Sequence, residues 1–145
     1  MSIDDYDWLA QRIVEGAPEA IVVADRDGVI RLWNAGAEAI FGYPAEEAVG
    51  QTLDLIVPER QRKAHWAGFG EVMKTGVTRY GRDELLKVPA LTKDGSRISL
   101  EFSICLLPGA ESEPVGAAAI MRDVTARWHE ERALRQKLAA LEGAS

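Results

Sequence analysis

Two adjacent segments decide the fold: RDGVIRLWN at residues 26–34 and IFGYPAEEAVG at residues 40–50. The first contains Asp27-Gly28, a dipeptide that supplies the positive φ angle of a tight hairpin turn. The apolar residues on either side of this turn are therefore expected to pair as antiparallel strands. Asn34 can cap the helix that follows, and Gly42 and Gly50 are suited to end two short helices. The order predicted is a β-hairpin followed by two short helices.

The spacing of apolar residues predicts the rest of the secondary structure, because strands repeat every second residue and helices every third and fourth. Helices are expected at residues 4–15, 59–74 and 125–144. Strands are expected at residues 19–25, 29–33, 85–91, 97–107 and 114–121. The turn Lys93-Asp94-Gly95 joins the third and fourth strands. The chain is therefore expected to be an α+β domain with five antiparallel strands.

This order of elements resembles the PAS family of sensory domains over roughly residues 12–126. The turn at residues 93–95 stands where the family has a hairpin, and Asp123-Val124-Thr125 is similar to the family's exit motif. The resemblance implies a PAS fold in which helices cover one face of the five-stranded sheet. It also implies three parts: an N-terminal amphipathic cap helix (1–16), a PAS core (17–125) and a C-terminal signalling helix with short coiled-coil character (126–145).

The exit motif gives two expected signal-output residues. By resemblance to the family, Asp123 should bond back to the domain and fix the start of the last helix. Thr125 should lie near the N-cap of that helix.

Composition argues against several classes of partner. The chain has 23 acidic and 17 basic residues and a pI of about 5.0, so it lacks the basic surface that nucleic-acid binding requires. No apolar run approaches the roughly 20 residues of a membrane helix, and the N-terminus has no secretion signal. We expect a cytoplasmic protein. The single cysteine, Cys105, cannot form an internal disulfide and is interpreted as a small buried strand residue.

The motifs of common enzymes are missing from the sequence. It contains no nucleophile elbow, P-loop or zinc-protease motif. With two histidines and one cysteine, a closed zinc site is not expected either. The reactive cysteine of light-oxygen-voltage flavin domains is also absent. We therefore expect sensing or protein interaction without catalytic turnover, so the chain is not expected to be an enzyme.

His65 is the residue best placed to carry chemistry. In the helix expected at residues 59–74, its spacing puts it on one inward face with Phe69 and Val72. The stretch PERQRKAH at residues 58–65 is similar to the segment of haem-binding PAS oxygen sensors that supplies the proximal histidine. This resemblance implies haem b with His65 as the iron ligand.

The same resemblance implies further contacts to haem. Arg79 or Arg82, which follow the helix, could meet the propionates. The sequence departs from the oxygen sensors at Leu85 and Leu86, near where those proteins place a ligand-stabilising arginine. The competing interpretation is a structural histidine that packs or bonds to backbone. The chain would then be a ligand-free PAS module for dimerisation or protein interaction.

The flanking helices predict a homodimer. Leu9 and Ile13 form an apolar stripe on the first helix, and Leu134, Leu138 and Leu141 have coiled-coil spacing on the last. One small sheet cannot cover both stripes, so a second copy is expected to do so. The sequence does not identify a downstream effector domain or partner protein.

Overall fold

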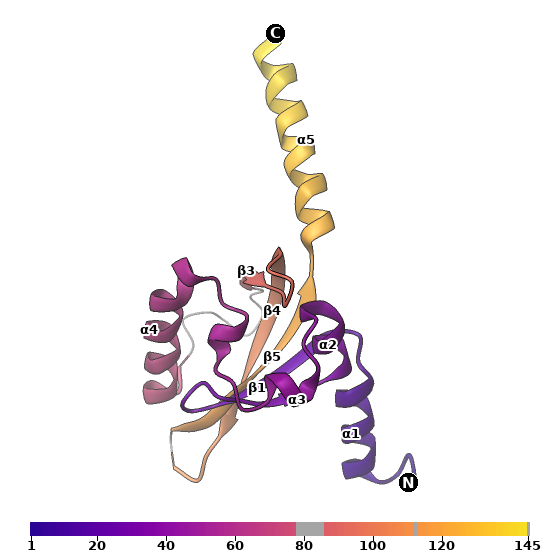
Figure 1. The fold of residues 1–145 in the computed structure, drawn as a ribbon, viewed down its shortest axis with the longest axis vertical. Coiled ribbons are helices and arrows are strands. Elements are labelled where there is room, and N and C mark those ends of the chain that lie inside the picture. The colour runs from indigo at the N-terminus through magenta and orange to yellow at the C-terminus, as the bar shows by residue number, and fades with distance from the viewer. Residues whose placement is uncertain (78–85, 112, 145) are drawn as a thin grey trace.

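The computed structural model describes residues 1–77, 86–111 and 113–144. These residues form an α+β domain with five antiparallel strands in the order β2-β1-β5-β4-β3 (Figure 1). The strands are β1 (Ala20–Asp25), β2 (Ile30–Trp33), β3 (Leu86–Leu91), β4 (Arg97–Pro108) and β5 (Pro114–Asp123). The helices are α1 (Tyr6–Gly16), α2 (Ala35–Phe41), α3 (Ala45–Ala48), the 3-10 turn η1 (Leu53–Leu55), α4 (Glu59–Thr75) and α5 (Thr125–Ala144). The predicted fold class is therefore confirmed.

The β1–β2 hairpin closes at the predicted dipeptide. Gly28 has a φ angle of 77°, in the left-handed region that favours glycine. The carboxylate of Asp25 accepts hydrogen bonds from the backbone N–H groups of Asp27 at 2.9 Å and Val29 at 3.1 Å. The turn is thus stabilised from within its own residues, which is why a local signal predicts it.

Asn34 caps α2, as predicted, and also joins three elements. Its side chain is buried, and its oxygen accepts from the N–H of Ala37 at 2.9 Å and of Ile21 at 2.8 Å. Its amide nitrogen donates to the carbonyl of Val14 at 2.8 Å and of Glu19 at 3.0 Å. One amide therefore fixes the relative positions of α1, β1 and α2.

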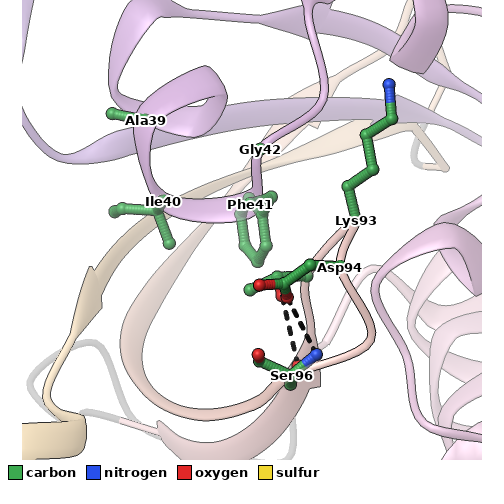
Figure 2. A pocket seen from close by; sticks show the side chains of 8 residues that line it. Ala39, Ile40, Phe41, Gly42, Lys93, Asp94 and Ser96 are labelled. Atoms are coloured by element: carbon green, nitrogen blue, oxygen red, sulfur yellow. Dashed lines mark hydrogen bonds between the residues drawn. The ribbon is translucent and has the colours of Figure 1, made fainter.

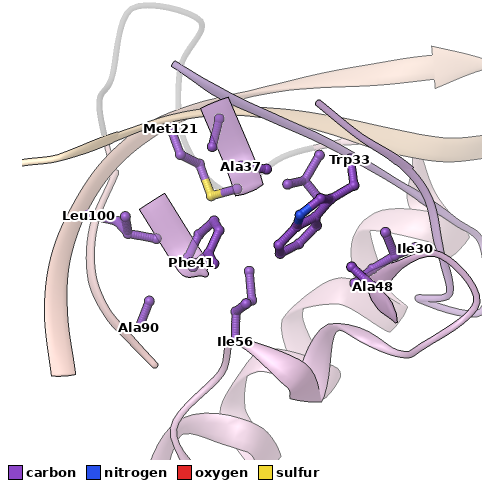
Figure 3. Packing of buried hydrophobic residues seen from close by; sticks show 11 residues of the cluster. Ile30, Trp33, Ala37, Phe41, Ala48, Ile56, Ala90, Leu100 and Met121 are labelled. Atoms are coloured by element: carbon purple, nitrogen blue, oxygen red, sulfur yellow. The ribbon is translucent and has the colours of Figure 1, made fainter. Parts of the chain in front are cut away.

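The hydrophobic core lies between one face of the sheet and the helices α2 and α3. Figure 3 shows Phe41 and Trp33 at its centre, with ring centroids 5.2 Å apart. Met121 of β5 and Leu100 of β4 close it from the sheet side. The buried cluster is Ala20, Val22, Ile30, Trp33, Ala37, Phe41, Ala48, Ile56, Ala90, Leu100 and Met121.

The strand register assigns the remaining residues to faces, because directly opposed residues of antiparallel strands share a face. Phe102 opposes the buried Met121, so Phe102, Ile104 and Leu106 lie on the inner face with the core. Cys105 lies on the other face and is exposed. The interpretation of Cys105 as a buried residue was therefore wrong. An apolar run along a strand does not by itself show which face a given residue occupies.

Among the described residues, no helix is both long and apolar enough to cross a membrane.

Candidate functional site

One side of α4 faces the domain and carries the candidate ligand residues. His65, Phe69 and Val72 are half-buried, and Met73 is 3% exposed. The helix contacts β5. The structure thus brings His65, Phe69 and Val72 onto one face. Arg79 and Arg82, the expected propionate partners, lie outside the described residues.

The ring of His65 contacts two aromatic rings of its own helix. Its ring is stacked with Phe69 at 5.9 Å between centroids and meets Trp66 edge-on at 4.9 Å. Its Nδ1 is buried, with no hydrogen-bond partner among the described residues. Burial lowers the pKa of His65 below its ordinary 6.5, although the nearby Asp54 carboxylate acts in the opposite direction. The imidazole is therefore neutral near pH 7 and keeps an uncommitted nitrogen.

Trp66 holds α4 against the β1–β2 hairpin. Its indole N–H donates to Oδ1 of Asp54 in η1 at 2.7 Å. Its ring lies so close to Gly28 that a Cβ added there would stand 2.1 Å from the ring. Arg62 adds a hydrogen bond to the Val57 carbonyl at 3.1 Å. The sequence did not predict this attachment, because the positive φ expected at Gly28 accounts for that glycine without a neighbouring ring.

The inner face of β5, the strand that α4 contacts, and of its neighbour β4 carries further apolar residues. Ala117 and Ala119 of β5 oppose Leu106 and Ile104 of β4, so all four share the core-facing side. Ile104 is nevertheless 42% exposed, and both alanines are only partly buried. Val88 of β3, which opposes the buried Leu100, is 38% exposed. This part of the inner face is apolar and is not closed by the described side chains.

A hollow of about 440 Å³ lies between the end of α2 and the β3–β4 turn (Figure 2). Asp94 is one of the polar residues that line it. A hydrogen bond from the Thr92 hydroxyl, with a second from the Ser96 N–H at 3.0 Å, lowers the pKa of Asp94 to about 2. This carboxylate is thus already used within the turn. Within residues 1–77, 86–111 and 113–144, no cluster of three or more metal-binding side chains occurs.

The two expected output residues meet where β5 ends and α5 begins. The carboxylate of Asp123 accepts hydrogen bonds from the backbone N–H of Thr125 at 3.0 Å and from its hydroxyl. The hydroxyl oxygen of Thr125 in turn accepts from the N–H of Ser99 in β4 at 2.9 Å. Arg127, two residues after Thr125, pairs with Glu101 of β4. The junction therefore ties the start of α5 to β4 as well as to β5.

The five-stranded antiparallel sheet, the helices on its inner face and the helix that leaves its last strand define a PAS fold. A protein-family model described as PAS fold matches residues 14–129, and the chain belongs to the PAS family. A solved PAS domain from Colwellia psychrerythraea has a TM-score of 0.72 and 25% identity, and the match covers 84% of this chain and 99% of that one.

Two sensor proteins are similar in sequence. The oxygen sensor protein DosP of Escherichia coli is 28% identical over 148 residues, which is 98% of this chain and 18% of DosP. The sensor protein FixL of Bradyrhizobium diazoefficiens is 38% identical over 53 residues, which is 37% of this chain and 10% of FixL. The chain thus spans less than a fifth of the length of either relative.

Proposed function

We propose that this chain is the sensory domain of a signalling protein and holds a small, mainly apolar ligand between α4 and the inner face of the sheet. It senses the ligand and does not transform it. Binding would alter how α4 rests on β5, and the strands β4 and β5 would carry the change to α5. The similarity to the sensor proteins FixL and DosP supports a sensory role.

The observation that carries this proposal is the Nδ1 atom of His65, which is buried without a partner among the described residues. A buried polar atom without a hydrogen bond costs about 1–3 kcal/mol, so a ligand that bonds to it would gain that amount. The half-exposed apolar residues of the facing sheet, Ile104 and Val88 among them, support an apolar ligand body.

Haem b is the specific ligand that these residues fit. A neutral imidazole with an uncommitted nitrogen is suited to bind iron axially, and Phe69 and Val72 would give the porphyrin apolar contacts. Arg79 and Arg82 remain the proposed propionate partners. When bound, haem would supply an iron that takes up diatomic gases. The similarity to a protein named as an oxygen sensor supports the same ligand.

Haem titration tests the ligand and its position. Purified protein should take up one equivalent of haem with a Soret band that shifts when carbon monoxide meets the reduced form. His65→Ala should greatly weaken this binding. His129→Ala is the matched control, because His129 is the only other histidine and is exposed on α5. Retention of tight binding by His65→Ala would contradict the assignment to His65.

A filling substitution tests for the ligand space without a known ligand. Ala117→Leu adds volume to the inner face beside α4. If this space is open, the unfolding free energy should stay unchanged or rise. If side chains fill it, overpacking should cost about 1–3 kcal/mol. Ala37→Leu, in the fully buried cluster, should cost that amount in either case. An equal loss in both variants would favour the ligand-free dimerisation module.

We also propose a homodimer formed through the flanking helices. The supporting observation is the exposure of large apolar side chains on them: Ile13 on α1 is 60% exposed, and Leu138 on α5 is 59% exposed. Light scattering should report twice 15.9 kDa at micromolar concentration. A monomer at all concentrations would overturn the dimer and leave the ligand proposal standing.

A further inference from the structure

The middle of α4 contains two glycines that no contact explains. Gly68 and Gly70 are exposed, and nothing lies within 4 Å of a Cβ added at either position. Neither has a positive φ angle. At Gly36, a glycine within α2, an added Cβ would instead stand 2.1 Å from the carbonyl oxygen of Glu19. Gly68 and Gly70 therefore serve neither a turn nor a close approach.

Glycine weakens a helix at such positions. It gains more backbone freedom than alanine when the helix opens, and each glycine in a helix interior favours opening of its turn about fivefold relative to alanine. Two glycines within three residues concentrate this weakness in the turn formed by residues 68–70. The residue between them is Phe69.

The part of α4 before this turn is bound to the rest of the domain. Arg62 donates a hydrogen bond to the backbone carbonyl of Asp54 at 3.3 Å, and the indole of Trp66 donates to the Asp54 carboxylate at 2.7 Å. Beyond Trp66, the described side chains of α4 make no hydrogen bond to another helix or strand, and Met73 is held by apolar burial. The turn at residues 68–70 thus separates a bonded part of the helix from a part that can move.

The ligand site itself requires a movement. Nδ1 of His65 is buried, so a ligand can reach it only after a neighbouring group moves aside. Two rings contact the imidazole, those of Trp66 and Phe69. Trp66 is fixed by its bond to Asp54 and by its packing on Gly28. A phenyl ring makes no such bond, so Phe69, between its two glycines, is the ring that can move.

We propose that residues 68–70 form a hinge in α4 and that Phe69 is the gate of the ligand site. When the turn opens, the Phe69 ring leaves the imidazole of His65 and uncovers Nδ1. The bonded part of the helix keeps His65 in place meanwhile. This inference rests on the proposed ligand site and adds the route by which a ligand enters and leaves it.

Stiffening the turn tests the hinge. In the double variant Gly68→Ala/Gly70→Ala, the protection of residues 67–72 against amide exchange should rise about 25-fold in the ligand-free protein, since each alanine contributes about fivefold. The variant should fold, because the added Cβ atoms meet no neighbour. Ala67→Gly, at an exposed position beside the turn, should lower this protection about fivefold. Gly143→Ala on α5, where an added Cβ also meets nothing, is the matched control and should leave α4 unchanged.

Haem kinetics test the gate. Association is measured by stopped-flow mixing with haem, and dissociation by transfer of bound haem to an excess of a scavenger protein. Both rate constants should fall in the double variant by the factor found in amide exchange, because the turn must open for passage in either direction. Kd should therefore change less than about twofold. Once Phe69→Ala has removed the gate, the two alanines should no longer slow association.

A thiol probe gives a reading without haem. In the Cys105→Ser background, which has no other cysteine, His65→Cys places a thiol beside the Phe69 ring. A buried thiol reacts with iodoacetamide only when it becomes accessible. Its labelling should slow by the same factor as amide exchange when the two alanines are added.

The outcomes separate this inference from the proposal on which it rests. Higher protection of residues 67–72 together with equal falls in both haem rate constants supports it. Unchanged protection overturns the hinge. Higher protection with unchanged haem kinetics and unchanged labelling overturns the gate. If the parent takes up no haem, the haem assignment fails, and the labelling of His65→Cys alone decides the gate.

Discussion

The two halves of the inner face of the sheet are built differently. Under α2 and α3, the side chains of the core are tightly packed: Phe41 and Ile30 have no exposed surface. Under α4, the same face of the sheet carries small or half-exposed side chains, and Ile104 is 42% exposed. We call the first the closed half and the second the open half. The difference indicates that stability is concentrated in the closed half, and the open half is the one that we propose as the ligand site.

The helices that cover the two halves also differ in how they are held. The closed half is joined by Asn34, whose amide binds backbone groups of α1, β1 and α2. In the open half, α4 is attached at the Trp66 ring and the Arg62 guanidinium, while His65 lacks a partner among the described residues. With Trp66 and Arg62 as its polar attachments and Met73 as its buried apolar contact, α4 can shift without unfolding the domain.

The largest expected effect contrasts one phenylalanine from each half. Phe41→Ala should lower the unfolding free energy by about 3–5 kcal/mol, because it leaves a cavity in a fully packed cluster. Phe69→Ala, on the half-buried face of α4, should cost about 1 kcal/mol, since less apolar surface is lost. Urea unfolding measures both. Similar losses would show that the two halves are packed alike and would remove the distinction.

The closed half was largely predictable from sequence, because its signals are local. Asp27-Gly28, Asn34 and Gly42 each specify a turn or cap through their own backbone, and all three occur where expected. Strand positions also followed from apolar runs. These features depend on neighbours within a few residues.

The open half was less predictable, because its contacts join distant parts of the chain. Helical spacing placed His65, Phe69 and Val72 on one face. It could not show that Trp66 packs on Gly28, 38 positions earlier (66 − 28), or that Nδ1 of His65 lacks a partner among the described residues. The exposure of Cys105 was missed for a related reason, since the face of a residue depends on strand register.

The second prediction tests the attachment of α4. Gly28→Ala should cost about 1–2 kcal/mol for the positive φ angle alone, and more because the new Cβ would overlap Trp66. Gly95→Ala is the matched control: its φ is 86°, and nothing lies within 4 Å of the added Cβ. Amide exchange in α4 should accelerate only in Gly28→Ala. Equal behaviour of the two variants would mean that the Trp66 contact does not hold the helix.

The third prediction concerns the junction at the other end of the strands. Asp123→Ala removes the acceptor for both the N–H and the hydroxyl of Thr125, so the start of α5 should loosen by about 1 kcal/mol. Hydrogen exchange should speed up beyond residue 124 and stay unchanged in both halves of the sheet. Asp4→Ala, on the exposed N-terminal segment, serves as control. Faster exchange across β4 and β5 would instead show that the junction supports the sheet itself.

The smallest expected effect is a pH dependence that reports on the open half. Because burial lowers the pKa of His65 in the folded state, the unfolded chain binds a proton more readily. The unfolding free energy should then rise with pH between the lowered pKa of the folded state and 6.5. The contribution of His65 is complete above its ordinary pKa of 6.5. As the pH falls through 6.5 towards the lower folded value, that contribution should be lost. Asp54 is the nearby charge that opposes the shift, so the loss should be modest.

Urea unfolding of the ligand-free protein at pH 7.5 and pH 5.5 measures this effect. His65→Gln should lose less stability between the two pH values than the parent, because its amide does not titrate. His129→Gln should behave as the parent, since His129 is exposed. If the unfolding free energy of His65→Gln changes with pH as much as that of the parent, the imidazole is solvated in the folded chain. The α4 side of the domain would then be open to water and would not be an apolar site for a ligand.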